Sequence, residues 1–278
     1  MSSDNTYILG HTATEMVRLT DQDRLITMGM DGLLPELPDL AGINRVLDVA
    51  CGPGGWALDL AQKYQHLQVQ GIDVDGGMID YATAQAKAGG LDNATFRVMN
   101  ALEPLDFPDN TFDLVNARFL AGFVPRNGWS QVIMELRRIL RPGGIIRWAE
   151  QEWTGTSSSF EQAEAYTFQA MRRAGQLLAA DERHTGITPL MRRFLSDAGF
   201  INVREVAHAL DFSAGTGVQR AYAQDLWIGT VLLQPFHLAL GVATQQELDD
   251  LQQHVQEELL SDDLYAVWFL LTALGAKP

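Results

Sequence analysis

The residues best suited to chemistry are a glycine-rich turn at 51–55 (CGPGG) and an acid, Asp73. The turn follows the apolar stretch 45–50 and precedes the amphipathic segment 56–64. Glycines let a ligand approach the backbone closely, and the start of the following helix offers unpaired N–H groups. Asp73 ends the next apolar stretch, where a carboxylate can accept two hydrogen bonds from a vicinal diol. Alone, this pattern indicates a dinucleotide-like ligand. The structural alternative is a tight turn and a helix cap.

The elements that must position these residues alternate along the first half of the chain. Apolar stretches typical of strands occupy 45–50, 67–73, 94–99, 112–118 and 144–149. Helical patterns lie between them at 55–64, 76–88 and 128–140. This alternation predicts a parallel sheet with helices on both faces.

The remaining segments do not show this regular alternation of strands and helices. A helix is expected near 14–28, before the first strand, with a linker after it. After residue 150 we expect further helices and strands, namely helices at 160–180 and 188–198, a strand at 203–207, mostly helix over 216–260, and an apolar last element at 265–271. That last element favours a buried strand, with a helix as the alternative.

Four landmarks, in order, resemble those of class I S-adenosylmethionine-dependent methyltransferases. They are DVACGPGG at 48–55, GID at 71–73, FPDNTFDLV at 107–115 and LRRILRPGG at 136–144. A nicotinamide-binding fold would instead show G-x-G-x-x-G in the first turn. The opening residues 7–22 are also similar to the cap of small-molecule members close to the ubiquinone/menaquinone-biosynthesis type.

The resemblance implies an α/β fold with a Rossmann-like doubly wound sheet of seven strands, the last of them antiparallel. It also implies a helical N-terminal cap over residues 1–40. The methyltransferase domain would occupy 41–278, with helical lid insertions near 151–185 and 213–262. An apolar cap helix of this kind also leaves room for a homodimer.

The resemblance further implies S-adenosylmethionine as the cofactor and S-adenosylhomocysteine as its product. The residues implied to bind it are Ala50, Gly52, Gly54, Asp73, Val74, Met78, Asn100, Ala101 and Arg118, with Tyr7 and Arg18 from the cap.

Several of these assignments have plain structural alternatives. Asn100 stands where the family often has an acid, and it can instead make a local turn. Arg118 can hydrogen-bond loop carbonyls, and Met78 can be core. Tyr7 can simply anchor the N-terminus, and Arg18 can be a solvated helix residue.

Catalytic candidates are fewer. Glu150 ends the fifth strand, at the sheet edge where open α/β folds place ligands, and is a candidate general base. His184 follows in the first insertion. Either can instead be an ordinary charged residue. Many relatives carry a histidine pair after strand four, but this chain reads FLAGF at 119–123.

The composition argues against several classes of binding partner, namely nucleic acids, metal ions and membranes. A net charge of -15 and a sequence pI near 4.7 argue against a nucleic-acid substrate. So does the sequence NARF at 116–119, which lacks the prolines of nucleic-acid amino-methylating enzymes. Cys51 is the only cysteine and the histidines are scattered, so no metal site is expected. No apolar run is long enough to span a bilayer and no signal peptide is evident, which predicts a cytoplasmic protein without membrane insertion.

Together these features predict methyl transfer to a small, hydrophobic or aromatic organic acceptor, in the biosynthesis of a quinone or a secondary metabolite. One alternative is a protein of the same fold that binds S-adenosylmethionine but catalyses a non-methylating step. Another is a nucleotide-binding or scaffolding protein without catalysis.

Overall fold

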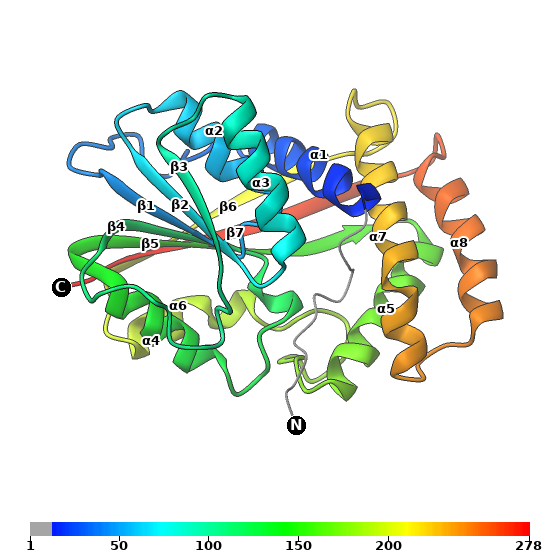
Figure 1. Ribbon diagram of the computed structural model, residues 1–278. Coiled ribbons are helices and arrows are strands. Elements are labelled where there is room, and N and C mark those ends of the chain that lie inside the picture. Colours follow the sequence, from blue (N-terminus) through cyan, green and yellow to red (C-terminus); the bar gives the residue numbers. More distant parts are fainter. Residues whose placement is uncertain (1–12) are drawn as a thin grey trace.

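The computed structural model describes residues 13–278 and is built around one seven-stranded sheet (Figure 1). The strand order is β3-β2-β1-β4-β5-β7-β6. The strands are β1 (Arg45–Val49), β2 (Gln68–Asp73), β3 (Ala94–Val98), β4 (Phe112–Arg118), β5 (Leu140–Gly155), β6 (Ile201–Asp211) and β7 (Ala266–Ala276). β7 runs antiparallel to both β5 and β6, whereas β1 to β5 pair in parallel. The predicted Rossmann-like sheet with an antiparallel last strand is therefore confirmed.

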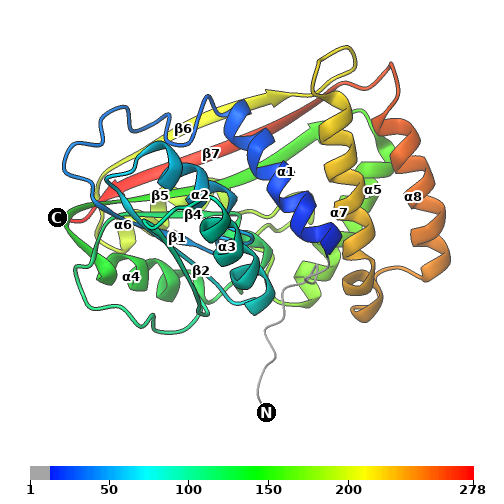
Figure 2. The same cartoon turned by 45° about the horizontal axis from the view of Figure 1, so that its top comes forward.

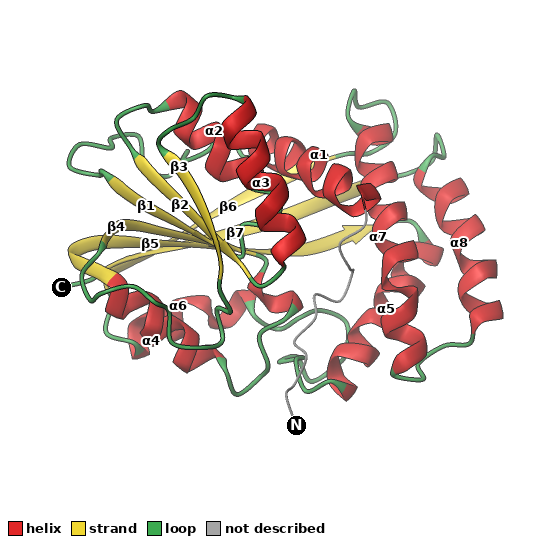
Figure 3. Cartoon of the chain, in the orientation of Figure 1, coloured by secondary structure: helices red, strands yellow, loops and turns green. Residues whose placement is uncertain are grey.

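Helices cover both faces of the sheet (Figure 3). On one face lie α2 (Gly55–Lys63) and α3 (Gly76–Ala88), and on the other α4 (Trp129–Ile139) and α6 (Met191–Asp197). Each face has its own apolar cluster. Trp56 and Leu60 of α2 pack with the β1 residue Val46, and Ile133 of α4 packs with Trp148 of β5. Burial of these side chains fixes the helices on the sheet and so fixes the strand ends.

A second group of helices lies beyond the ends of the short strands (Figure 2). It consists of α5 (Ser158–Arg173), α7 (Gln219–Ala239) and α8 (Gln245–Leu259). α1 (Ala13–Gly29) packs against both α2 and α7, and so connects the two helical groups. Two short 3-10 turns, η1 (Leu120–Gly122) and η2 (Thr188–Leu190), complete the described elements. Within residues 13–278, no helix has the length and apolar character needed to cross a membrane.

Several elements differ from the sequence-based expectation. The strand expected at 203–207 extends over Ile201–Asp211, and the helix expected at 188–198 is the turn η2 followed by α6. The helix expected over 160–180 ends at Arg173, because Gly175 adopts a positive φ of 75° and Gln176 N–H bonds back to the Met171 carbonyl. The strand expected at 144–149 extends from Leu140 to Gly155, since Leu140 pairs with Phe112 of β4 and β7 pairs with residues from Ile145 to Gly155. The expectation that Glu150 ends this strand is therefore wrong, because Glu150 lies within β5 and pairs with Leu271. The last apolar element, for which strand and helix were both open, is a strand.

Candidate active site

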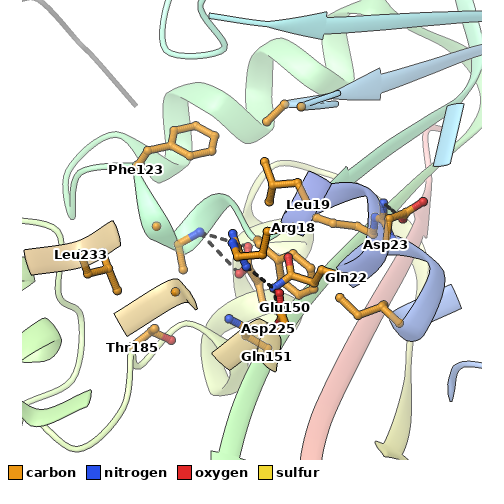
Figure 4. Close-up of a pocket in the computed structure, with 18 of the residues that line it drawn as sticks. Arg18, Leu19, Gln22, Asp23, Phe123, Glu150, Gln151, Thr185, Asp225 and Leu233 are labelled. Atoms are coloured by element: carbon orange, nitrogen blue, oxygen red, sulfur yellow. Dashed lines mark hydrogen bonds and ion pairs between the residues drawn. The ribbon is translucent and has the colours of Figure 1, made fainter. Parts of the chain in front are cut away.

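A cavity of about 420 Å³ lies at the carboxyl ends of β1, β2 and β4, and Glu150 and Gln151 line it from within β5 (Figure 4). Its floor is formed by the glycine turn after β1, and its walls include residues of α1, α5 and α7. Open α/β sheets bind ligands at this edge. The cavity brings together most of the residues predicted to bind a cofactor: Ala50, Gly52, Asp73, Val74, Met78, Asn100, Ala101, Arg118 and Arg18.

The glycine turn borders the cavity through Gly52. Gly52 has a φ of 54°, and a Cβ built there would meet only Leu19 Cδ1, at 3.8 Å. Ala50 adopts a left-handed φ of 56° and lines the cavity beside it. Gly54 is different, because it does not line the cavity, and a Cβ on it would lie 2.8 Å from the Ala82 Cβ. Gly52 therefore leaves backbone open to a ligand, while Gly54 permits close packing of the turn beneath it.

Asp73 is held by backbone groups at the end of β2. Its Oδ2 accepts the Gly52 N–H at 2.9 Å and its Oδ1 accepts the Asp75 N–H at 3.0 Å. Each oxygen retains a further lone pair for a ligand hydroxyl. Burial raises the pKa of Asp73 above its ordinary value, which a hydrogen-bond-donating ligand would offset.

Asn100 lines the cavity and also makes a local turn. Its Oδ1 accepts the Leu102 N–H at 3.0 Å, and its Nδ2 donates to Glu103 at 3.3 Å. The carbonyl oxygen keeps a second lone pair. Nearby, Met78 is buried in the wall, and Val74 is 40% exposed. Both interpretations of Asn100, as ligand and as turn former, are compatible with this geometry.

Two arginines reach the cavity, and both are engaged in ion pairs. Arg18 of α1 donates to Glu15 through Nε and Nη2, at 2.7 and 2.8 Å, and to Asp225 of α7 at 2.8 Å. Arg118, at the end of β4, pairs with Asp23 of α1. Arg18 thus joins the cap helix to α7, as Figure 4 shows. Tyr7, the other cap residue predicted to bind cofactor, lies outside the described residues.

Asp23 was missed by sequence reasoning. It is 8% exposed and lines the cavity, and its Oδ2 has no hydrogen-bond partner among the described residues. A Cβ on Gly55 would lie 2.6 Å from that Oδ2, so the carboxyl packs against the start of α2. The only sequence signal is its position one helical turn after Leu19, which also faces the cavity.

A chain of buried polar groups supports the cavity from below. Asp48 lines the cavity, and its Oδ1 accepts from Asn116 Nδ2 at 2.7 Å. Asn116 Oδ1 accepts from Arg147, whose Nε donates to Glu36 at 2.9 Å. Asp48, Asn116 and Arg147 are aligned neighbours on β1, β4 and β5. Burial raises the pKa of Asp48 to about 7.

The two catalytic candidates are placed very differently. Glu150 lines the cavity but is 1% exposed, and its carboxylate accepts from Trp148 Nε1 at 2.7 Å and from the Ala121 N–H at 3.3 Å. Burial raises its pKa to about 8. His184 is not among the lining residues; its side chain is 40% exposed and lies 3.6 Å from Asp181. The structure therefore brings Glu150 to the cavity and leaves His184 outside it.

The far end of the cavity is mainly apolar. One face of α5 and one face of α7 line it, with residues at helical spacing: Phe160, Ala163, Glu164, Thr167, Phe168 and Met171 on α5, and Leu226, Gly229, Thr230, Leu233 and Phe236 on α7. No group of three or more His, Cys, Asp or Glu residues within 13–278 is arranged to hold a metal ion.

The donor set fits S-adenosylmethionine. Gly52 leaves backbone open, Asp73 keeps acceptor capacity for a ribose diol, and Asp23 Oδ2 is a buried oxygen without a partner among the described residues. The cavity also has six acidic residues and two arginines in its lining. An acidic cavity suits a cationic sulfonium ligand.

Comparisons with known proteins agree with this geometry. The profile of the family Methyltransf_25, described as a methyltransferase domain, matches residues 46–144. The demethylmenaquinone methyltransferase of Listeria welshimeri is 30% identical over 183 residues, covering 62% of this chain and 76% of the relative. That of Geobacillus kaustophilus is 32% identical over 172 residues, covering 58% and 72%.

Solved structures share the fold at low sequence identity. A Haemonchus contortus phosphoethanolamine N-methyltransferase 2 with bound S-adenosyl-L-methionine has a TM-score of 0.55 at 20% identity. The match covers 90% of this chain and 52% of that one, so this chain spans about half its length. Geranyl diphosphate C-methyltransferase from Streptomyces coelicolor A3(2) also has a TM-score of 0.55, at 14% identity, with 96% and 85% covered.

The fold and the site define an enzyme that transfers a methyl group to a small molecule. The chain belongs to the class I S-adenosylmethionine-dependent methyltransferases, and it resembles the enzymes of menaquinone biosynthesis.

Proposed function

We propose that this methyltransferase acts on an oxygen, carbon or nitrogen atom of a small, largely apolar, ring-bearing acceptor, as in the biosynthesis of a quinone or a secondary metabolite. The observation that carries this proposal is one cavity that runs from the glycine turn to the apolar faces of α5 and α7. Such a cavity binds an apolar ligand by burying its surface.

The substrates named for the relatives, compared with the cavity lining, favour an acceptor with an apolar ring over one with a phosphate group. Demethylmenaquinone, the substrate named for the Listeria and Geobacillus relatives, is an apolar quinone. Geranyl diphosphate, bound with Mg²⁺ by the Streptomyces enzyme, carries a diphosphate that requires cations. Here Arg18 and Arg118 already pair with carboxylates. The described lining therefore favours the uncharged acceptor.

The roles of the cavity residues follow from their positions. When bound, S-adenosylmethionine supplies an electrophilic methyl group on a sulfonium. The backbone at Gly52 and the carboxylate of Asp73 would hold its amino-acid and ribose parts, and Asp23 Oδ2 would accept a hydrogen bond from its ammonium group. Catalysis then requires alignment of the acceptor and exclusion of water. We assign the exclusion of water to the cap within 1–40 and to lid segments near 151–185 and 213–262.

Glu150 is the candidate general base, and its environment suggests how to test it. With a pKa of about 8, the carboxyl is mostly protonated at pH 7, which suits a hydrogen-bond donor better than a base. We expect Glu150→Gln, which mimics the neutral form, to retain turnover within about threefold at pH 7. A loss of about 100-fold would instead identify Glu150 as the base.

Calorimetry with S-adenosylmethionine, S-adenosylhomocysteine and NAD tests the donor site. We expect the first two to bind and NAD not to bind. Asp73→Asn should weaken S-adenosylhomocysteine at least about tenfold, by loss of charge-assisted hydrogen bonds. The control Asp80→Asn removes an exposed carboxylate on α3 and should change affinity less than about twofold. Equal effects of the two substitutions would contradict the proposed ribose site.

Transfer itself is tested with a donor labelled in its methyl group and a metabolite extract. Label should appear in an apolar, ring-bearing product. A protein that binds the donor yet labels nothing would match the non-methylating alternative, and label only in phosphorylated metabolites would overturn the proposed acceptor class.

A further inference from the structure

The apolar end of the cavity contains one carboxyl group that the proposed mechanism does not use. Glu164 lies on the cavity face of α5, with Phe160 one helical turn before it and Phe168 one turn after it. No hydrogen bond or ion pair of Glu164 is found among residues 13–278. A carboxyl in such a wall is costly unless a ligand or a proton compensates its charge.

The neighbours of Glu164 do not supply that compensation. The charges that act on it are those of Glu152 on β5 and Glu161 on α5, and both are acidic. On α7, Asp225 is acidic, and burial lowers the pKa of His237 to about 4, so that this imidazole is neutral near pH 7. Burial and the two acidic neighbours raise the pKa of Glu164 to about 8.

Two further cavity residues carry buried oxygens without partners. Gln151 and Gln176 both line the cavity, and the Oε1 atom of each has no hydrogen-bond partner among the described residues. Together with Glu164, they give the cavity lining several hydrogen-bond acceptors. The two arginines in that lining, Arg18 and Arg118, are both engaged in ion pairs. Such a wall complements a ligand that donates hydrogen bonds, and it repels an anion.

The opposite wall provides space for an apolar body. Gly229 lines the cavity from α7, and a Cβ built there would have no heavy atom within 4 Å. It lies between Leu226 and Leu233 on the cavity face of that helix. The missing side chain leaves room between the two helices.

We propose that Glu164 is an acceptor-recognition residue: in its ionised form, its carboxylate binds a hydroxyl or ammonium donor on an otherwise apolar acceptor whose body lies against Gly229, and it disfavours acceptors that present a carboxylate or phosphate there. This assignment rests on the proposed function and narrows its substrate class. A hydroxyl or ammonium group on the bound ligand compensates the carboxylate charge that no protein group within residues 13–278 compensates. A hydrogen bond to a charged carboxylate raises affinity by about tenfold.

The test uses the full chain saturated with S-adenosylhomocysteine and four probes that share one ring system, measured by calorimetry at about pH 9, above the raised pKa of Glu164, so that its carboxyl is ionised. 2-Naphthol presents a hydroxyl, 2-(aminomethyl)naphthalene presents an ammonium group, naphthalene presents neither, and 2-naphthoate presents an anion. We expect one or both donor probes to bind about tenfold more tightly than naphthalene, and 2-naphthoate to bind more weakly than naphthalene. Whichever of 2-naphthol and 2-(aminomethyl)naphthalene binds more tightly indicates whether the methyl acceptor presents a hydroxyl or an amine to Glu164.

Variants assign the selectivity to Glu164. Glu164→Leu should abolish the preference for donors over naphthalene, and Glu164→Gln should relieve the exclusion of 2-naphthoate. The control Glu257→Gln removes an exposed carboxylate from the neighbouring helix α8 and should leave all four affinities within about twofold. Gly229→Val should weaken all four probes by filling the space, while S-adenosylhomocysteine affinity, measured for every variant, reports that the fold is intact.

The outcomes separate the two proposals. If native protein binds neither S-adenosylmethionine nor S-adenosylhomocysteine, the proposed function fails. If S-adenosylhomocysteine binds but the donor probes bind no better than naphthalene, or if no probe binds, the role of Glu164 is overturned while the methyltransferase assignment stands. Variants of Glu164 that behave like Glu257→Gln would overturn that role in the same way.

Discussion

The clearest energetic prediction concerns Arg18, which connects α1 to α7. Arg18→Met keeps a long apolar side chain but removes the charge-assisted hydrogen bonds of Arg18, which among residues 13–278 include two to Glu15 and one to Asp225. All three residues are at least nine-tenths buried. Removing one partner from a buried ion pair leaves an uncompensated charge and typically costs about 3–5 kcal/mol. We expect Arg18→Met to lower the free energy of unfolding by that amount, a large share of a typical total of about 5–15 kcal/mol.

The measurement is urea unfolding followed by circular dichroism, with the slope m compared between variants to verify that the same surface is exposed. Arg24→Met is the matched control, because Arg24 lies on the same helix, its side chain is 70% exposed, and its contact with Asp21 is 3.5 Å long. An exposed pair of this kind contributes about 0–1 kcal/mol. If the two variants lost equal free energy of unfolding, the buried ion pairs of Arg18 would not have the stabilising role that we assign to them.

A second measurement distinguishes two roles for Arg18, which are holding α1 against α7 and binding the cofactor. If Arg18 contacts the cofactor carboxylate, Arg18→Met weakens S-adenosylhomocysteine but leaves 5′-methylthioadenosine, which lacks the amino-acid part, unaffected. If Arg18 acts by holding the cap, both ligands weaken by a similar factor. The ion pairs with Glu15 and Asp225 make us expect the second result.

Three other predictions concern single features. Gly54→Ala should destabilise the protein and weaken S-adenosylhomocysteine, because the new Cβ would lie 2.8 Å from Ala82 at a φ of 83°; unchanged melting and affinity would contradict this. The free energy of unfolding should fall as pH rises from about 4 to 8. The raised pKa values of Asp48, about 7, and Glu150, about 8, keep both carboxyls protonated in the folded state at pH values where unfolded carboxyls are already ionised. Glu150→Gln should flatten that slope in urea titrations at each pH, and an unaltered slope would count against the assignment. Thr244→Ala removes the N-cap of α8 and should cost about 1 kcal/mol, with no change in S-adenosylhomocysteine affinity.

Local features explain why the sequence predicts that the glycine turn and Asp73 lie together at the cavity. The turn at 51–55 and the acid Asp73 are adjacent to strands whose apolar pattern is unambiguous. In a parallel sheet, the carboxyl ends of these strands meet at one edge, so their contact needs no further information. Gly54 shows the limit of this reasoning. Sequence identifies a required glycine, but only the structure shows that Ala82 lies behind it.

The rest of the site depends on contacts between distant segments. Asp23 reaches the start of α2 only because α1 packs across it, and Arg18 meets Asp225 across 207 positions of sequence. No local pattern encodes such contacts. Glu164 is intermediate, because its helical spacing from Phe160 and Phe168 places a charge on an apolar face, a local inconsistency that often marks a functional position.

One helix serves both halves of the cavity. Leu19 and Asp23 of α1 face the glycine turn, while Arg18 and Gln22 bond to Asp225 of α7, which carries part of the acceptor wall. Because these contacts use adjacent positions on a single rigid element, α1 cannot shift away from the donor site without straining its bonds to α7. Loosening the packing of α1 should therefore weaken the binding of methyl donor and acceptor together, although the proposed sites of the two ligands consist of different residues.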